Sequence, residues 1–249
     1  MKNAPILLTE KDKLNEDTKK EITRLCAKNV YVIGGTSIIS GNIVSQLKSM
    51  NLKVERISGD TRYTTSLAIA KKLGTVSEIA VVNGVTGLAD AVSIAPVAAS
   101  KKMPIILASP DTGTKAFDEY IKSNNIKTSY VIGGENAISK DVASKLPNVK
   151  RLGGSSRNET NALILEKFYT NKDLNNVFVA KDGMAKANDL IDALAVGVLA
   201  AKENSPLVIV GNQLDAKQEK VLLTKKPKEA TQVGGNGNEN VYIQIINLY

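Results

Sequence analysis

The segment Arg56–Thr65 reads RISGDTRYTT, and a second segment, Arg151–Thr160, reads RLGGSSRNET. Each turns at glycine after a strand-like stretch and leads into a helical pattern. The two copies then continue in parallel, with GLADAV followed by MPIIL in one and DLIDAL followed by SPLVIV in the other. The chain is therefore a tandem repeat with a period of about 100 residues, far longer than the periods of solenoid proteins.

A third, partial copy opens the chain. The stretch PILLT at residues 5–9 corresponds to MPIIL and SPLVIV, and VIGG at residues 32–35 recurs at residues 131–134 and more loosely as QVGG at 232–235. This first copy lacks its own arginine motif, one strand and the Gly/Asp helix, so we expect a longer parent chain. The sequence predicts three units, at residues 1–53, 54–148 and 149–249.

Short runs rich in Val and Ile alternate with amphipathic stretches along the whole chain. This alternation is typical of a parallel sheet covered by helices, in which strands buried on both faces are apolar at successive positions. The predicted fold class is α/β, with tandem small open parallel-sheet units of the Rossmann or Toprim type. We predict strands at Pro5–Thr9, Val30–Ile33, Lys53–Ile57, Ile79–Asn83, Pro104–Ala108, Ser129–Ile132, Lys150–Leu152, Val177–Ala180, Leu207–Val210 and Ala230–Val233. We predict helices at Glu16–Lys28, Ser40–Met50, Tyr63–Leu73, Ala89–Lys101, Thr114–Asn124, Lys140–Leu146, Glu159–Tyr169, Leu190–Glu203, Asp215–Leu223 and Asn240–Asn247.

Composition excludes several classes of site. The 249 residues include no His and one Cys, so catalytic Ser-His-Asp and Cys-His sites, an intramolecular disulfide and zinc spacing are all excluded, and we expect no cofactor or metal. The net charge of +8 favours an anionic partner, or simply solubility. Aromatic residues are 4% of the chain with no Trp, so we expect no nucleic acid partner. No apolar run reaches the roughly 18 residues of a membrane span, and we see no signal peptide at the start.

Glycine pairs follow three predicted strands and are the first candidate binding elements. Gly34-Gly35 and Gly133-Gly134 lie at the carboxyl ends of strands, where open α/β sheets form their ligand crevices. Helix N-termini at such turns suit phosphate or carboxylate, although a tight turn alone also explains the glycines. No dinucleotide-binding or P-loop motif is present.

The arginine motifs are the second candidate. Arg62 and Arg157 fall in the first turn of a helix, where a cation opposes the helix dipole at a cost of about 0.3–1 kcal/mol. Either a carboxylate or an acidic ligand would offset this cost. The carboxylates within reach are Asp60 or Asp90 for the second unit and Asp192 for the third, and an arginine fork can bind a carboxylate and a ligand together.

Asp90 and Asp192 each open an Ala-rich helix, where an acidic residue is favourable even without a ligand. As catalytic carboxylates they would need a partner with a displaced pKa, and the sequence shows no matched pair in both units. Asn83 and Lys181 lie at strand ends facing the same edge.

Together these motifs resemble the cell wall binding repeat 2 family. The stretches that carry the resemblance are RISGDTRY at 56–63, ADA at 89–91, PIIL at 104–107 and VIGG at 131–134. The resemblance covers nearly the whole chain as three units, the first truncated. The arginine motif is diluted in the last unit, where Asp60 becomes Ser155 and Tyr63 becomes Asn158.

The resemblance implies units grouped about a pseudo-threefold axis, in proteins of the Gram-positive surface and S-layer. It also implies noncovalent binding to an anionic secondary cell-wall polysaccharide, and a secreted, wall-associated protein. We interpret the chain as a multivalent anchoring module, not an enzyme, with S-layer proteins as further partners. A wall-glycan enzyme using Asp90 and Asp192 and a lattice or protein-interaction scaffold are the alternatives. The candidate ligand-binding residues are Arg56, Asp60, Arg62, Asn83, Asp90, Gly34, Gly35, Gly133, Gly134, Arg151, Arg157, Lys181 and Asp192.

Overall fold

The computed structural model describes residues 4–170, 174–235 and 237–248. By its internal contacts the chain divides into two compact units. Residues 6–74 form the smaller unit, and residues 75–249 form nearly all of the larger one. Each is an α/β unit built on parallel strands, as the sequence predicts.

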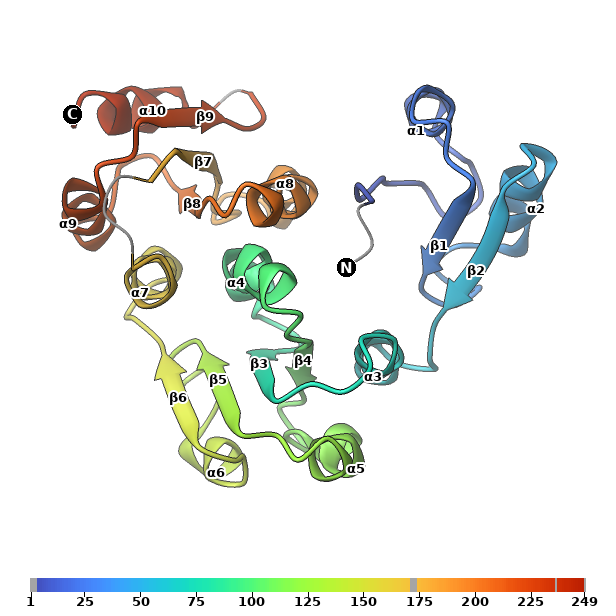
Figure 1. Ribbon diagram of the computed structural model, residues 1–249, viewed down its shortest axis with the longest axis horizontal. Helices are drawn as coiled ribbons and strands as arrows, with labels where there is room; N and C mark the ends of the chain where they lie inside the picture. The colour runs from blue at the N-terminus through green and yellow to red at the C-terminus, as the bar shows by residue number, and fades with distance from the viewer. Residues whose placement is uncertain (1–3, 171–173, 236, 249) are drawn as a thin grey trace. The chain divides into compact units, whose positions relative to one another are not determined.

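The larger unit contains two parallel sheets (Figure 1). The first has the strand order β4-β3-β5-β6, and the second has the order β8-β7-β9. In both, the chain starts at an inner strand, places the next strand on one side and returns to the other side. The strands are β3 (Glu78–Asn83), β4 (Ile105–Ala108), β5 (Thr128–Ile132), β6 (Val149–Leu152), β7 (Asn176–Lys181), β8 (Leu207–Val210) and β9 (Glu229–Gln232).

Three helices of the larger unit, α6, α7 and α9, begin at a side-chain cap. The side chains of Ser139, Ser156 and Asp215 each accept a hydrogen bond from a backbone N–H in the first turn, which satisfies one of the unpaired donors there. Asn125 and Asn204 have a positive φ just after a helix, a conformation that asparagine tolerates. The helices are α4 (Leu88–Ser100), α5 (Asp118–Ser123), α6 (Lys140–Ser144), α7 (Arg157–Phe168), α8 (Leu190–Lys202), α9 (Ala216–Lys225) and α10 (Glu239–Ile246), with 3-10 turns η1 (Lys115–Phe117) and η2 (Ala187–Asp189).

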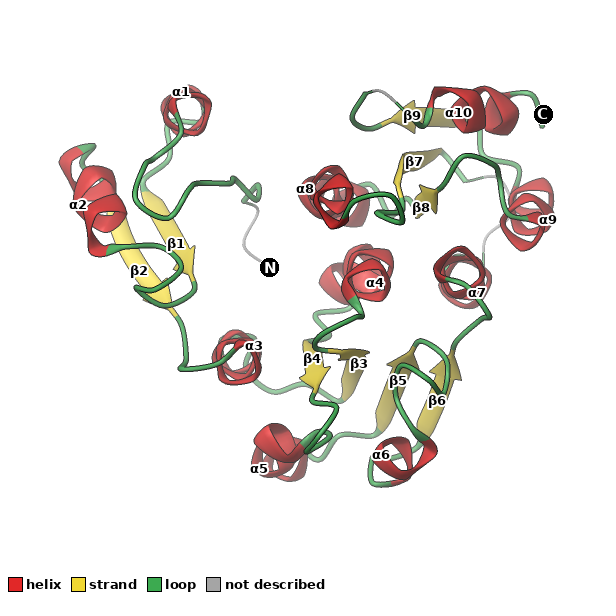
Figure 2. Cartoon of the chain, turned by 180° about the vertical axis from the view of Figure 1, so that it is seen from behind, coloured by secondary structure: helices red, strands yellow, loops and turns green. Residues whose placement is uncertain are grey.

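The core of the larger unit joins its two sheets. Strands β5 and β8 are buried along their whole length. One cluster of buried side chains runs continuously from β3 and β5 to β7 and β8, with α4 and α7 contributing. Helices α4 and α8 lie side by side (Figures 1 and 2). The second and third repeats therefore share one hydrophobic core.

The smaller unit is a two-stranded parallel sheet with three helices. Its core is a separate cluster that includes Leu14, Ile22 and Ile43. Thr61 and Thr64 form a capping box at the start of the last helix. The elements are α1 (Glu16–Arg24), β1 (Asn29–Ile33), α2 (Gly41–Ser49), β2 (Lys53–Ile57) and α3 (Arg62–Lys71).

All ten predicted helices form, but one predicted strand does not. Pro5–Thr9 has no regular secondary structure, although its sequence matches that of β4. In the second repeat β4 pairs with β3, and residues 6–74 contain no counterpart of β3. Residues 5–9 therefore have the composition of a strand but no neighbouring strand to pair with in the smaller unit. As a result, Ile6 and Leu8 remain 39% and 45% exposed.

Strand pairing crosses the predicted unit boundaries. Strand β2, which we expected to open the second unit, pairs with β1 of the first. Strand β6, expected to open the third unit, likewise pairs with β5. The β1-β2 sheet and the β4-β3-β5-β6 sheet thus each include the first strand of the next sequence repeat, and the arginine motif that follows that strand starts on the preceding sheet. The ranges 1–53, 54–148 and 149–249 stay a prediction.

Candidate binding site at the junction of two repeats

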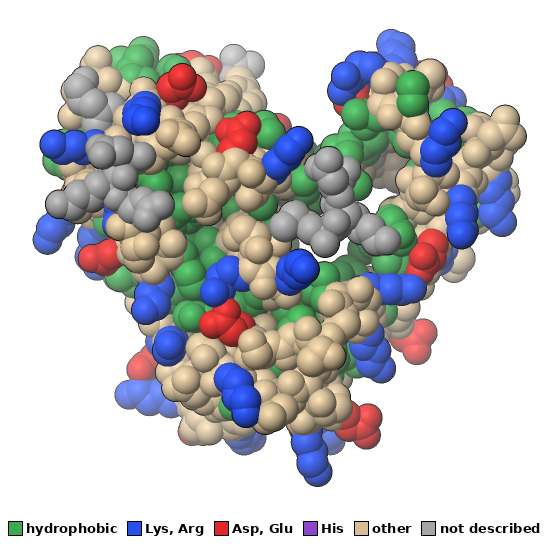
Figure 3. All heavy atoms as spheres, in the orientation of Figure 1, with side chains coloured by type: hydrophobic (Ala, Val, Ile, Leu, Met, Phe, Trp, Pro, Cys, Tyr) green, Lys and Arg blue, Asp and Glu red, His purple; other side chains and the backbone are tan. Residues whose placement is uncertain are grey.

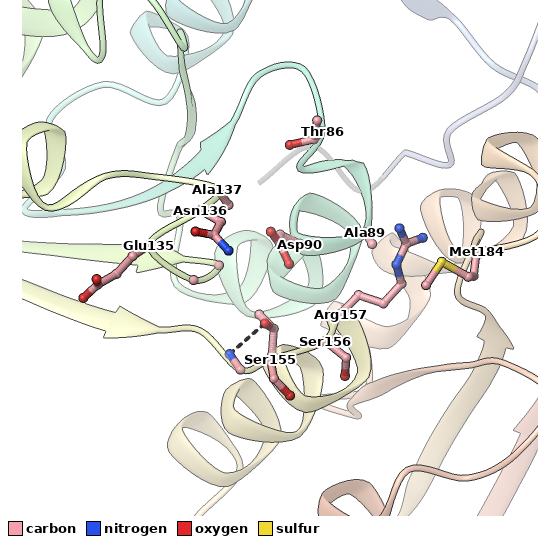
Figure 4. Close-up of a pocket in the computed structure, with 14 residues that line it drawn as sticks. Thr86, Ala89, Asp90, Glu135, Asn136, Ala137, Ser155, Ser156, Arg157 and Met184 are labelled. Atoms are coloured by element: carbon pink, nitrogen blue, oxygen red, sulfur yellow. Dashed lines mark hydrogen bonds between the residues drawn. The ribbon is translucent and has the colours of Figure 1, made fainter.

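A cavity of about 450 Å³ lies at the carboxyl ends of β3, β5 and β6, against the first turn of α7 (Figure 4). The strand order reverses between β3 and β5, and open α/β sheets bind ligands at this point of reversal. Its lining comes from both complete repeats: Thr86, Ala89, Asp90, Gly133, Gly134, Glu135, Asn136, Ala137, Gly154, Ser155, Ser156, Arg157, Thr160 and Met184.

The turn after β5 favours glycine at its first position. Gly133 has φ +107°, and a Cβ placed there would lie 2.8 Å from Asp90 Oδ2 and 3.1 Å from Ala137 Cβ. Gly134 has no such restriction, since its nearest contact would be Gly154 O at 3.4 Å. The absence of a side chain at Gly133 lets the carboxylate of Asp90, in the first turn of α4, lie directly against the turn.

Burial sets the ionisation of Asp90. Loss of solvation raises the pKa of its carboxyl from 3.8 to about 6, and the positive charge of Arg157 opposes this rise without cancelling it. The side chain of Asp90 is therefore close to half protonated in mildly acidic solution. It can act as a hydrogen-bond donor below about pH 6 and as a negative charge above that pH.

Arg157 is the first residue of α7 and the cation of the cavity. One guanidinium nitrogen, Nη1, donates to the backbone oxygen of Asp182 at 2.7 Å. We expected Asp192 to be the carboxylate near Arg157. The carboxylate that acts on Arg157 is instead Asp90 of the preceding repeat, while Asp192 lies against Gly234. The reason is the strand pairing described above, because β6 belongs to the β4-β3-β5-β6 sheet and places Arg157 at the end of that sheet.

The first turn of α7 supplies hydroxyl groups. Thr160 Oγ1 accepts a hydrogen bond from Gly154 N at 3.0 Å, shown dashed in Figure 4. Glu159 accepts from Ser155 N and pairs with Lys217, both at 2.8 Å. The contact with Lys217, followed by the Ser155 amide, lowers the pKa of Glu159 to about 2. Glu159 thus occupies one backbone donor beside the cavity.

Three other candidates hold the glycine turns in place. Arg151 donates through Nη1 to Gly133 O and Gly134 O, at 2.9 and 3.1 Å, and through Nη2 to Ile138 O at 2.8 Å. Arg56 makes the equivalent contacts to Gly34 O and Ser40 O in the smaller unit. Asn83 Nδ2 donates to Ala137 O at 2.7 Å, while its Oδ1 accepts from the amides of residues 85 and 86. These contacts give all three a positioning role.

The remaining candidates form two partial sites. In the third repeat, Asp192 lies so close to Gly234 that an added Cβ would overlap its carboxylate. Residues 158–249 contain no arginine. In the smaller unit, Gly34, Gly35, exposed Asp60 and Arg62 occur without a counterpart of α4 and its aspartate. Lys181 pairs with Asp189 at 3.3 Å.

Sequence reasoning missed the polar residues of the α7 turn and the apolar edge of the cavity. Ser156 carried a signal, because a serine three residues before Glu159 is a capping-box pattern. Met184 carried none: it is 71% exposed in a loop, and only the packing of the two repeats brings it to the cavity. The guanidinium of Arg157 points toward Met184 (Figure 4).

The surface charge is diffuse. Lys and Arg side chains are scattered over the face in Figure 3 instead of gathering in one continuous patch. Two carboxylates line the cavity, but Glu135 points away from Asp90 in Figure 4 and pairs with Lys140 at 3.4 Å. The cavity therefore offers a cation, hydroxyls and one protonatable carboxyl, which suits binding of an anionic, hydroxylated ligand.

These features define a tandem-repeat α/β module with a cavity at the junction of two repeats. The family model of cell wall binding domain 2 matches residues 1–44, 56–143 and 151–242. The chain belongs to this family of cell wall binding domains, with three tandem copies, the first truncated. Membership places the protein at the cell wall.

Similar proteins support this assignment. The N-acetylmuramoyl-L-alanine amidase LytC of Bacillus subtilis is 34% identical over 94% of this chain and 46% of its own length, and the amidase enhancer of the same organism is 34% identical over 84% and 28%. The solved structures of Cwp6 and Cwp8 from Clostridium difficile match 99% of this chain with TM-scores of 0.90 and 0.88, at 34% identity. The chain spans less than half the length of each. Among the described helices, none is long and apolar enough to cross a membrane.

Proposed function

We propose that this chain anchors its protein noncovalently to an anionic polysaccharide of the cell wall, and that the cavity between the second and third repeats is the principal binding site. The observation that carries the proposal is the meeting of Arg157, the Gly133-Gly134 turn and Asp90 in one cavity. Arg157 and the amino end of α7 would bind a phosphate or carboxylate group. The hydroxyls of Ser156 and Thr160 would contact neighbouring sugar hydroxyls.

Affinity for a polymer does not need one strong site. The chain carries one complete site and two partial ones, and a polymer that contacts several weak sites in succession gains avidity through its high effective concentration. The net charge of +8 adds a diffuse attraction that salt weakens. We expect S-layer proteins as further partners, no nucleic acid partner and a secreted protein.

Two other functions have less support. A glycan-cleaving enzyme would need two carboxyl groups facing one bond, and Glu135 points away from Asp90. We therefore infer a binding module without catalytic activity of its own. A scaffold that binds only protein would not need a buried, protonatable carboxyl beside an arginine. If the wild type hydrolyses wall polysaccharide and Asp90→Asn does not, the enzymatic alternative would be supported instead.

The test is retention on purified cell walls, measured by cosedimentation. We expect Arg157→Met to lower the affinity at least tenfold, because Arg157 is the one cation among the described residues that line the cavity. The matched control is Arg24→Met, since Arg24 lies on the exposed face of α1, where it pairs with Glu21. Circular dichroism would verify that both variants fold.

Walls stripped of their anionic polymer complete the design. We expect the wild type to lose retention on stripped walls and to lose it progressively with salt. The proposal would be refuted if retention stayed the same on stripped walls, at high salt and in the Arg157→Met variant.

A further inference from the structure

Strand β8 is the outer strand of the β8-β7-β9 sheet, and its outer edge is buried. The backbone oxygens of Pro206 and Val210 accept hydrogen bonds from β7 and from the residue that follows it. The backbone groups of alternate residues in a strand face opposite sides, so those of Leu207 and Ile209 face away from β7. Such groups need other hydrogen-bond partners, because a buried backbone N–H or C=O without one is costly.

Side-chain amides of α7 and α9 supply these partners. Asn161 Nδ2 donates to Leu207 O at 2.8 Å and its Oδ1 accepts from Ile209 N at 3.4 Å, as a peptide group of a neighbouring strand would. Gln218 Nε2 donates to Ile209 O at 2.8 Å and to Asn161 Oδ1 at 2.9 Å, and Asn158 Nδ2 donates to Ile209 O at 2.9 Å. Asn161 and Gln218 are fully buried. We call Asn158, Asn161 and Gln218 the amide cluster.

The last copy of the arginine motif differs from the preceding copy at positions that contact the third repeat. Asn158 and Glu159 occur where the preceding copy has Tyr63 and Thr64. Asn158 bonds to β8, and Glu159 pairs with Lys217 of α9 at 2.8 Å. The changes that dilute the motif therefore attach the first turn of α7 to elements of the third repeat.

Helix α7 lies between the two sheets, and Arg157 directly precedes the amide cluster in the chain (Figures 1 and 2). We propose that the residues of the amide cluster are positioning residues, which fix the first turn of α7 on the edge of β8 and so hold Arg157 in the cavity beside Asp90. Strand β6 fixes the start of α7 from the second sheet, and the amide cluster fixes it from the third. Hydrogen bonds are directional, so they define one register of α7 along β8, which apolar contacts alone would not.

The pKa of Asp90 reports on the position of Arg157, because the positive charge of Arg157 lowers this pKa. Carboxyl carbon NMR measures the titration of Asp90 without any ligand. We expect Arg157→Met to raise the pKa above the wild-type value of about 6 and Asn161→Ala to raise it in the same direction. The double variant should match Arg157→Met alone, since both changes remove the same interaction.

Asn176→Ala is the matched control. Asn176 is also a buried asparagine of the third repeat, but it bonds to Thr231 at the amino end of β7, the end opposite to the cavity. We expect this variant to lose stability in urea and to leave the pKa of Asp90 unchanged. If Asn161→Ala does not fold, Asn158→Ala makes the same comparison, with a smaller rise because it removes one hydrogen bond.

Retention on cell walls gives a second readout, which rests on the proposed function. We expect Asn161→Ala to lower wall affinity toward the level of Arg157→Met, and Asn176→Ala to leave it unchanged. A pKa of Asp90 that stays at the wild-type value in Asn161→Ala, or that rises equally in Asn176→Ala, would overturn the positioning role. A raised pKa with unchanged wall affinity would support the positioning role and instead contradict the cavity as the binding site.

Discussion

At the scale of single residues, the site depends on one carboxyl group whose charge is adjustable. Asp90 lies against a glycine turn and beside Arg157, and burial raises its pKa to about 6. An anionic ligand in the same cavity would be repelled by ionised Asp90 and could accept a hydrogen bond from the neutral form. Binding of an anionic polymer and protonation of Asp90 therefore favour one another.

We predict that retention on cell walls rises as the pH falls from 7 to 5, and that Asp90→Asn removes most of this dependence. Asparagine is neutral and retains a donor, so the variant at pH 7 should bind about three- to tenfold more tightly than the wild type. The upper limit is about tenfold because the pKa of Asp90, about 6, lies about one unit below pH 7. Asp192→Asn is the control and should keep the wild-type profile. An unchanged pH profile in Asp90→Asn would contradict the prediction.

The same group makes a separate prediction about folding. Because the folded-state pKa is raised above 3.8, the folded protein binds this proton more tightly than the unfolded chain. The stability contributed by Asp90 thus falls as the pH rises from about 4 to 6 and stays lower above that range. We expect Asp90→Asn to raise the melting temperature at pH 7 and to leave it nearly unchanged at pH 4, as calorimetry can measure. A lower melting temperature at pH 7 would argue against a buried, destabilising charge.

At the scale of elements, the turn after β5 is what brings the charged groups together. Gly133 leaves room for Asp90, and Arg151 ties the turn to β6 through three hydrogen bonds. Neither residue needs to touch the ligand. Substitutions of Gly133 or Arg151 should therefore act by altering the shape of the turn.

We predict that Gly133→Ala destabilises the fold by about 1–3 kcal/mol, because a side chain there combines a strained positive φ with overlap of Asp90. Gly134→Ala is the neighbouring control and should cost clearly less, since its added Cβ meets only one atom at 3.4 Å. Urea denaturation of both variants measures the difference. Equal losses would show that the turn is not restricted as described.

We predict that Arg151→Met costs about 2–3 kcal/mol of unfolding free energy, because it leaves three backbone oxygens without their charged donor. Lys140→Met serves as the control in the same unit, since Lys140 is 79% exposed and pairs only loosely with Glu135. If both variants unfold at the same urea concentration, Arg151 does not brace the turn.

At the scale of the whole molecule, the sequence predicted the repeats, the α/β class and the position of nearly every helix and strand, because hydrophobic period and glycine turns are local signals. The prediction of a strand at Pro5–Thr9 was wrong because strand formation depends on a neighbouring strand to pair with. The partner of Arg157 was wrong for a related reason: which aspartate faces this arginine depends on β6 joining the preceding sheet. The predicted pseudo-threefold arrangement stays a prediction.

The unequal completeness of the sites gives a further prediction for the whole chain. Arg62→Met should reduce wall binding less than about twofold, whereas Arg157→Met should reduce it at least tenfold, since the turn near Arg62 lacks the helix that carries the aspartate. Isothermal titration with a soluble wall-polymer fragment would compare the two affinities and the stoichiometry. Equal losses would instead indicate equivalent sites.

Strand β6 begins the third repeat but pairs with the sheet of the second, and Arg157 follows it. The cavity is therefore formed by two consecutive repeats together and not by either repeat alone. Arrays of such repeats then obey a simple counting rule. In an open linear array, the number of complete pockets is one less than the number of complete repeats, and removing an inner repeat disrupts two pockets while creating one hybrid. Evolution can therefore change the ligand preference of the array by reordering repeats, without altering a single residue within them.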